Sequence, residues 1–356
     1  MARGVHIPAM IVVVTGSTGF IGRHLVDALL ERGAEVRALV RPETPRDSRD
    51  PRIGHWEADL LDDRSVRESP VWDGVTRVFH LAGVTKGRTL DQFRAGNVFP
   101  TANLLAALAA RPGRPPRVVL VSSQAAAGPA GDASAPVRET DRPRPVEAYG
   151  RSKLQAEQAV VRYRDSLPIT IVRPSSVYGP GDRDFLNLFR QERHRVAFRV
   201  VPRDHALSLV YVEDLVRALL LAAEHPATVG RTYFVADEVP VIWGELYDAI
   251  DAVLGRTPLA IPLPSPLLQL AARGGDIVSA VTGRPSLLNR NKATLARQRW
   301  WLCDAARARQ EMGWRTEVPL LDGLHRTYNW YVEARWLKPP KAARKPEQAT
   351  TEEQTT

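Results

Sequence analysis

A tyrosine and a lysine four residues apart, Tyr149 and Lys153, lie in the segment EAYGRSKLQAEQA. The segment predicts the start of a helix, and residues i and i+4 lie on one face of a helix, one turn apart. The phenol and the ammonium group can therefore reach the same small volume. The ordinary pKa of a phenol, about 10, makes it a poor base at neutral pH, and a nearby ammonium group favours the phenolate. The spacing also occurs on many solvated helix faces, so its meaning depends on what else lies beside it.

A glycine-rich loop, VTGSTGFIG, follows a short apolar run near the N-terminus. Its glycines, Gly16, Gly19 and Gly22, come after a predicted strand and open a predicted helix. The first glycine allows a tight turn, the second lets the backbone approach a pyrophosphate, and the third lets helix and strand pack closely. The helix N-terminus favours the anion. Glycines alone also mark ordinary turns, but strand, glycines and helix in this order predict a dinucleotide site.

These groups must be positioned by regular elements, and short β-branched runs alternate with longer helical patterns along the chain. This alternation predicts an α/β fold with a parallel, doubly wound sheet of the Rossmann type. The strands are near-continuous apolar runs, as expected when helices cover both faces. We expect strands at 10–15, 35–40, 53–60, 76–83, 117–123, 168–174, 208–215 and 231–237. We expect helices at 21–32, 91–110, from 147 onward and at 213–224.

The same pattern divides the chain into a Rossmann domain and a smaller C-terminal substrate-binding region. The predicted parts are a leader (1–9), the Rossmann domain (10–178, to which 208–237 returns), the substrate-binding region (179–207 and 238–337) and a tail (338–356). The tail is rich in Pro, Lys and Glu without apolar periodicity, so we expect it to be disordered.

Composition narrows the class of protein. Hydrophobic residues make up 44% and charged residues 25% of the 356 residues, which is ordinary for a globular protein. A single cysteine, Cys303, excludes an intrachain disulfide, and neither a membrane span nor a signal peptide is visible, so we expect a cytoplasmic protein. The net charge is +9, but the arginines are scattered among acids and no zinc spacing or helix-turn-helix pattern occurs. We therefore expect neither a nucleic-acid partner nor a metal.

The glycine loop, a serine after the fifth predicted strand and Y-x-x-x-K, in this order, resemble the short-chain dehydrogenase/reductase superfamily. More narrowly, they resemble its extended branch of NAD-dependent epimerases, dehydratases and steroid-type dehydrogenases. The resemblance runs from about Met10 to Leu337. It also rests on EADLLD (57–62), VFHLAG (78–83), NVFPTANLLAA (97–107), VSSQAAAG (121–128), RPSSVYGPGD (173–182) and YVEDL (211–215).

The resemblance implies that Tyr149 is the general acid/base and that Lys153 lowers its pKa and binds the nicotinamide ribose. The family's catalytic hydroxyl lies five residues before the glycine of VSSQAAAG, which selects Ser123 over Ser122. Asn97 matches a residue that supports a proton relay in some relatives, and is equally well a polar residue near a helix start. The implied cofactor contacts are Gly16, Thr18, Gly19, Phe20, Ile21, Gly22, Arg41, Asp59, Leu60, Leu81, Ala82, Gly83, Tyr149, Lys153, Pro174, Ser176 and Val177.

The choice of cofactor depends on the end of the second predicted strand. NAD-preferring folds place an acidic residue there to bind the ribose 2′-hydroxyl, and in this chain that position falls on Val40. The next residue is Arg41, whose guanidinium group suits a 2′-phosphate. We therefore expect NADP. NAD is the alternative, if Arg41 is only a solvated charge and Glu43 reaches the ribose.

Two residues argue against one branch of the family. Gln124 and Ala125 stand where 4,6-dehydratases carry an Asp-Glu pair, and neither can transfer a proton as a carboxylate. The expected function is an NAD(P)-dependent oxidoreductase that interconverts a secondary alcohol and a ketone. A nucleotide-sugar epimerase is the alternative enzyme. A non-catalytic nucleotide-sensing or assembly subunit is the alternative of another class, although such relatives usually lose the Tyr or the Lys.

The substrate stays open between an apolar and a glycosyl molecule. The stretch 261–288 resembles sterol- and flavonol-type reductases more than sugar epimerases, and it fits a packed cap better than a face on a membrane. We expect a small-molecule substrate and no membrane partner, and leave a homodimer open. Four arginines could still grip a nucleotide-sugar diphosphate: Arg199, Arg203, Arg284 and Arg290.

Overall fold

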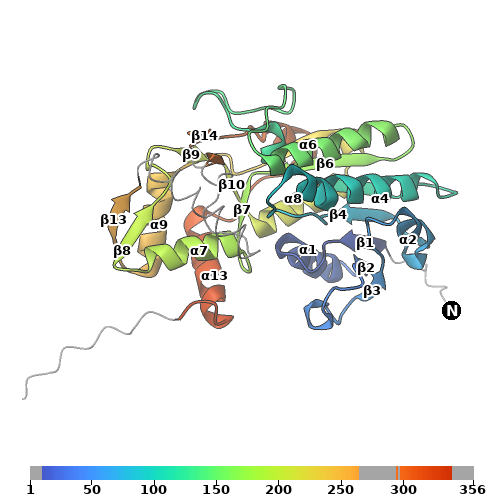
Figure 1. Cartoon of the computed structure of the whole chain (residues 1–356), viewed down its shortest axis with the longest axis horizontal. Helices are drawn as coiled ribbons and strands as arrows, with labels where there is room; N and C mark the ends of the chain where they lie inside the picture. The colour runs from blue at the N-terminus through green and yellow to red at the C-terminus, as the bar shows by residue number, and fades with distance from the viewer. Residues whose placement is uncertain (1–9, 264–293, 296, 339–356) are drawn as a thin grey trace, which may run out of the picture.

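The computed structural model describes residues 10–263, 294, 295 and 297–338 (Figure 1). Its centre is a seven-stranded sheet in the order β11-β6-β5-β4-β1-β2-β3, with every neighbouring pair parallel. The strand order reverses at β1, as in Rossmann folds, so the predicted fold class is confirmed. The strands are β1 (Ile11–Thr15), β2 (Glu35–Val40), β3 (Gly54–Glu57), β4 (Arg77–His80), β5 (Arg117–Val121), β6 (Ile169–Pro174) and β11 (Thr232–Val235).

Both faces of this sheet are buried, which explains the continuous apolar runs. Val12 and Val14 point into one hydrophobic core, and Val13, between them, points into the other. All three side chains are fully buried. The first core is shared with α1 (Phe20–Glu31), α8 (Val212–Glu224) and α12 (Ala306–Met312). The second is shared with α2 (Asp63–Glu68), α4 (Phe99–Ala109) and α6 (Ala148–Val160).

The predicted helix 91–110 contains an irregularity that the sequence did not indicate. It consists of α3 (Leu90–Phe93), a π-helical turn (Arg94–Val98) and α4. Within that turn the Asn97 side chain pairs with the backbone of Val84, accepting from its N–H at 2.8 Å and donating to its carbonyl at 3.1 Å. Single π-helical turns inside α-helices are frequent at functional sites, and this one presents the Asn97 side chain to Val84.

The predicted strand 208–215 is shorter than expected. Its residues form β10 (Leu209–Tyr211), which pairs with β7 (Ser176–Tyr178) outside the central sheet. Helix α8 then begins at Val212, because Glu213 and Asp214 lie in its first turn, where acidic side chains favour the helix N-terminus.

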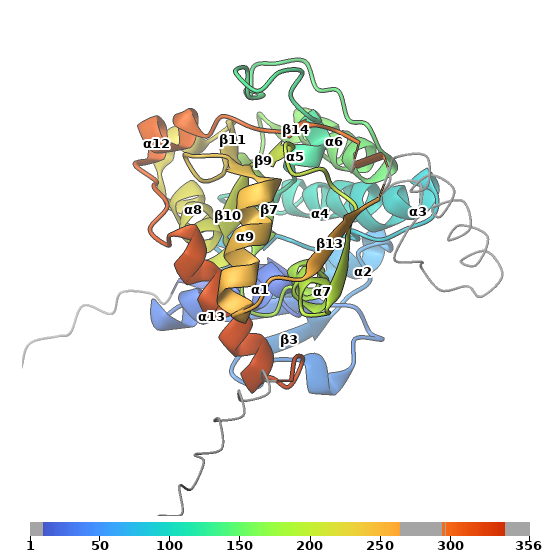
Figure 2. The same cartoon turned by 90° about the vertical axis from the view of Figure 1, so that its left-hand side faces the viewer.

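The remaining elements surround a third hydrophobic core that includes Tyr178, Phe189 and Tyr331. Figure 2 shows α9 and α13 side by side at the front of this region, with α7 next to them. The helices are α7 (Arg183–Glu192), α9 (Trp243–Leu254) and α13 (Leu320–Glu333). The short strands pair β8 (Val196–Arg199) with β13 (Leu259–Pro262), and β9 (Ala206–Leu207) with β12 (Val241–Ile242) and β14 (Trp300–Trp301).

Several predictions fall on residues that the structure does not describe. They are the leader 1–9, the tail beyond Lys338, most of 261–288, and the arginines Arg284 and Arg290. Among the described residues, no helix is long and apolar enough to cross a membrane, and no group of His, Cys, Asp or Glu side chains is arranged to hold a metal ion. The domain boundaries remain predictions.

Candidate active site

The start of α6 fixes the tyrosine and the lysine against the end of β5. The Glu147 carboxylate caps the helix by accepting hydrogen bonds from the backbone N–H groups of Tyr149, at 2.6 Å, and Gly150. One turn later Lys153 is buried, and its ammonium group donates to the carbonyl of Val121 at 2.7 Å. Both side chains therefore lie beside the carboxyl end of the central sheet.

Two neighbouring serines follow β5, and they point in different directions. The Ser123 hydroxyl lies close enough to the Tyr149 phenol to lower its pKa, and it also caps α5 (Gln124–Ala127) by accepting from the backbone N–H of Ala125 at 3.1 Å. The Ser122 hydroxyl instead donates to the carboxylate of Glu157. The structure thus brings Ser123, rather than Ser122, to the tyrosine.

Burial dominates the ionisation of this pair. It raises the pKa of Tyr149 to about 12, although the nearby Ser123 hydroxyl acts in the opposite direction. It lowers the pKa of Lys153 to about 8, against the opposing influence of the Glu157 carboxylate. The resemblance implies that the pKa of Tyr149 is lowered. In the protein without a cofactor, burial raises this pKa instead. A neutral phenol at physiological pH is a proton donor, which suits the reduction of a ketone.

A buried ion pair supports the site from behind and was not predicted from the sequence. Glu157 accepts two hydrogen bonds from the guanidinium group of Arg173, at 2.9 and 2.6 Å. Both side chains are only 6% exposed. Because Glu157 also holds Ser122 and lies one turn beyond Lys153, this pair links the end of β5 to α6.

The glycine loop has the close approaches that its sequence predicts. Gly16 has φ +74°, and a Cβ there would lie 2.7 Å from the backbone nitrogen of Ala82. A Cβ on Gly22 would lie 2.1 Å from the carbonyl oxygen of Gly16. Gly19 precedes α1, and no side chain caps this helix. The N–H groups of its first turn are therefore free to bind an anion.

Two buried hydroxyls lie near this predicted cofactor site without a hydrogen-bond partner in the structure. They belong to Ser17 in the glycine loop and Ser175 after β6, which are 5% and 7% exposed. A buried polar group without a partner is costly, so a polar ligand at these positions would stabilise the protein. The residues present therefore fit a dinucleotide. The sequence predicted Thr18 and Ser176 as cofactor contacts and did not identify Ser17 and Ser175 beside them. A hydroxyl without a hydrogen-bond partner can be recognised only in the folded structure.

The other predicted cofactor residues lie in segments that follow the carboxyl ends of the strands, where α/β sheets bind ligands. The segment Leu81 to Gly83 follows β4, and a Cβ on Gly83 would lie 3.9 Å from the Lys153 ammonium nitrogen. Arg41 follows β2, and Asp59 and Leu60 follow β3. Pro174 ends β6, and Ser176 and Val177 lie in β7, which comes directly after it. Phe20 and Ile21 begin α1.

Arg37, within β2, and Arg41, directly after it, differ in how many hydrogen bonds and ion pairs hold their side chains. Arg37 donates to the carbonyls of Val71 and Asp73, at 3.0 and 2.8 Å. Among the residues that the structure describes, Glu43 is the one ion-pair partner of Arg41, at 3.3 Å, and both side chains are about two-thirds exposed, at 67% and 66%. Such surface pairs contribute little, so Arg41 can exchange Glu43 for another anion.

A hydrogen-bonded chain joins the glycine-loop strand to the π-helical turn. The ring of buried His80 lies 2.7 Å from the Thr15 hydroxyl and 3.0 Å from the Thr101 hydroxyl. Thr101 donates to the carbonyl of Asn97 at 2.7 Å, so its oxygen accepts from the histidine. The Asn97 side chain also donates to the Ser152 hydroxyl at 2.9 Å. Asn97 therefore connects the π-helical turn to Val84 and to Ser152 of α6.

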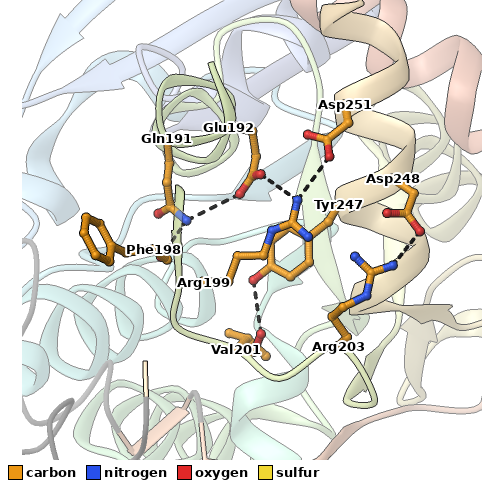
Figure 3. A network of polar contacts seen from close by, with 9 residues as sticks. All are labelled: Gln191, Glu192, Phe198, Arg199, Val201, Arg203, Tyr247, Asp248 and Asp251. Atoms are coloured by element: carbon orange, nitrogen blue, oxygen red, sulfur yellow. Dashed lines mark hydrogen bonds and ion pairs between the residues drawn. The ribbon is translucent and has the colours of Figure 1, made fainter. Parts of the chain in front are cut away.

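Two of the arginines considered for a diphosphate already have acidic partners. Figure 3 shows Arg199 between Glu192 and Asp251, at 2.9 and 3.1 Å. Arg203 pairs with Asp248 at 2.6 Å. Arg199 is also buried, so it does not present a free cation to a ligand.

The chain is similar in sequence and in fold to known proteins. Residues 12–236 match the model of the NAD dependent epimerase/dehydratase family. The chain is 31% identical over 344 residues to the ceramide reductase of Caulobacter vibrioides, covering 94% of this chain and 97% of the relative. It is 33% identical over 236 residues to a ketoreductase of Stigmatella aurantiaca that is named for a farnesyl dihydroquinoline oxide, covering 64% of this chain and 68% of the relative. The UDP-glucose 4-epimerase of Thermotoga maritima, solved with UDP-glucose, has the same fold, with a TM-score of 0.73, 22% identity, and coverage of 92% of this chain and 100% of that one.

Proposed function

The chain belongs to the NAD dependent epimerase/dehydratase family, in the extended branch of the short-chain dehydrogenase/reductases, and is an NAD(P)-dependent oxidoreductase; from this premise we propose that it reduces a ketone to a secondary alcohol on an apolar substrate. The observation that carries the proposal is the placement of the Ser123 hydroxyl beside the Tyr149 phenol, whose pKa it lowers, one helical turn from buried Lys153. We assign the proton transfer to Tyr149.

The protein's part of the reaction follows from these groups. When bound, the nicotinamide supplies or accepts the hydride. Tyr149 holds a proton at its hydroxyl oxygen and gives it to the substrate oxygen. The Ser123 hydroxyl orients the substrate oxygen by hydrogen bonding. Lys153 contributes positive charge beside the phenolate that forms on Tyr149. The same residues run the reverse reaction, in which the phenolate takes the proton of the alcohol.

We propose NADP as the preferred cofactor. Arg41 directly follows β2, it is paired with the exposed Glu43, and Val40 supplies no carboxylate for a ribose 2′-hydroxyl. A guanidinium group in this position favours a 2′-phosphate through charge-assisted hydrogen bonds.

An apolar substrate is supported by three observations. Gln124 and Ala125 supply no carboxylate for dehydratase chemistry. Arg199 is buried between Glu192 and Asp251, so it is not available to a diphosphate. The ceramide reductase and the farnesyl quinoline ketoreductase, both named for substrates with long apolar chains, match the chain at 31% and 33% identity.

Steady-state kinetics with two substrate classes tests this proposal. The protein is supplied with NADPH and either a long-chain 3-keto lipid in detergent or a short-chain ketone, and NADPH oxidation is followed. We expect oxidation with the keto lipid. A separate reaction contains UDP-glucose and catalytic NAD. Formation of UDP-galactose there, without ketone-dependent NADPH oxidation, would establish the epimerase alternative instead.

A further inference from the structure

The two-stranded sheet of β8 and β13 has one apolar face that no described element covers. Its register pairs Val196 with Leu259 and Phe198 with Ile261. Paired residues of parallel strands, and alternate residues of one strand, point to the same face. These four side chains therefore lie together, and we call them the apolar ribbon. They are 38%, 67%, 52% and 38% exposed, in the order just given.

The opposite face of β8 is packed against the protein and holds the ribbon in place. Ala197 is fully buried, and Arg199 at the end of the strand is bound by Glu192 of α7 and Asp251 of α9. Figure 3 shows the Phe198 side chain directed away from this network. Figure 1 places β8 and β13 at one end of the molecule, opposite the end that carries α2 and β3.

Within the segments 190–199 and 252–263 the exposed charges have one sign, and the exposed Asp248 near Arg256 is paired with Arg203. Ahead of β8 the chain reads RQERHR (190–195), and ahead of β13 the residue Arg256 is exposed. Glu192 is the acid within 190–199, and it is fully buried and paired with Arg199. Arg256 donates to the carbonyl of Arg193 at 2.7 Å, which joins the two basic segments.

We propose that the apolar ribbon and its arginines form a docking surface for an anionic lipid bilayer. Isolated exposed apolar side chains are ordinary, but a contiguous apolar face marks a contact. Apolar side chains that enter the acyl boundary, flanked by arginines that meet lipid phosphates, are the pattern of interfacial membrane binding. The absence of exposed acids on the segments 190–199 and 252–263 selects an anionic partner surface.

This surface lies outside the predicted cofactor site, and the proposal does not depend on the reaction. From the sequence, a membrane contact ranked last for the stretch 261–288. The exposed face of β8, which that interpretation did not include, is what favours the lipid surface. A substrate dissolved in a membrane would reach a protein held there, which is compatible with an apolar ketone.

Vesicle co-sedimentation with the full chain tests the proposal. The vesicles contain phosphatidylcholine alone or with phosphatidylglycerol, and bound protein is measured at low and high salt. We expect binding to the anionic vesicles, weakened by salt because the attraction of arginines is screened. Absence of binding to phosphatidylglycerol vesicles would overturn the proposal, whatever the protein's enzymatic activity.

Matched variants distinguish binding through this surface from nonspecific binding to vesicles. Replacing Phe198 and Ile261 together by Ser should weaken binding about tenfold or more. Replacing Arg195 by Gln should weaken it about fivefold. The controls Val161→Ser and Arg164→Gln, at exposed positions on the Rossmann side, should bind as the wild type does. Equal losses in the controls would contradict the proposal.

Two other occupants of the ribbon give distinct results. If a second copy covers it, the double variant changes the oligomeric state in size-exclusion chromatography and vesicles do not bind. If the chain's own segment covers it, hydroxyl-radical footprinting of the free protein shows Phe198 and Ile261 protected. Either result replaces the lipid surface.

Discussion

Glu157 lies one helical turn after Lys153 on the buried side of α6, and its carboxylate accepts hydrogen bonds from Arg173 at 2.9 and 2.6 Å. The carboxylate raises the pKa of Lys153, while burial lowers it to about 8. The ion pair therefore helps to keep the lysine protonated near neutral pH. Glu157 acts through Lys153 and through Ser122, so it is a positioning residue.

Replacing Glu157 by Gln removes this charge and keeps the shape of the side chain. We expect the pKa of Lys153 to fall, so that the alkaline decline of kcat/KM begins at lower pH. Removing one partner of a buried pair also lowers the free energy of unfolding by about 3–5 kcal/mol. Glu157→Asp keeps the charge and should keep the alkaline decline. A Gln variant with the wild-type pH profile would show that Glu157 is only structural.

Ser122 and Ser123 form a matched pair for testing the catalytic hydroxyl. Ser123→Ala removes the hydroxyl beside Tyr149 and should lower kcat by about 10²-fold, the scale of losing one stabilising donor. Ser122→Ala removes the bond to Glu157, so it should cost about 1 kcal/mol of stability and change kcat much less. The opposite order of kcat effects would reverse the assignment.

The cofactor preference can be measured by titrating NADPH and NADH into the wild type and Arg41→Ala. We expect the wild type to prefer NADPH. The substitution should weaken NADPH by about 1.5–3 kcal/mol, the scale of hydrogen bonds to charged groups, and change NADH little. Arg164→Ala, at an exposed position beyond the C-terminal end of α6, is a suitable control. Tighter binding of NADH by the wild type would establish NAD as the cofactor.

His80 should contribute to the pH dependence of stability. Burial lowers its pKa from 6.5 to about 3, and the charge of Lys153 adds to this effect. Below about pH 6.5 the unfolded histidine binds a proton that the folded protein excludes, so stability is lost as pH falls toward 3, by at most about 1.4 kcal/mol per pH unit. Urea unfolding at neutral pH and near pH 5 should show a smaller loss for His80→Gln than for the wild type. If the free energy of unfolding fell equally in both proteins, His80 would not be the cause of the pH dependence.

Much of this arrangement could be predicted from local patterns. The apolar runs and the glycine loop predicted the parallel sheet, and helical spacing predicted that Tyr149 and Lys153 lie together. Ser123 was selected by resemblance, and the structure brings it to Tyr149, although the catalytic roles stay predictions. These features were accessible because each depends on neighbours in sequence or on a periodic pattern.

The remainder depends on contacts between distant segments. Glu157 meets Arg173 from β6 and Ser122 from the end of β5, and no local pattern indicates that pairing. Asn97 in the π-helical turn meets Val84, and the raised pKa of Tyr149 follows from burial. The sequence predicts that Arg199 could bind a diphosphate, but in the fold its guanidinium group is paired with Glu192 and Asp251.

The central claim is that the Tyr149 hydroxyl carries the proton, and Tyr149→Phe tests it most directly, because it removes only that oxygen. Turnover of an established ketone substrate with saturating NADPH should be compared with NADPH binding measured by fluorescence titration. We expect kcat to fall by about 10²-fold or more, the scale of general acid/base catalysis, with the dissociation constant of NADPH nearly unchanged. A variant that keeps near-normal kcat would contradict the account, since the proton would then come from another group.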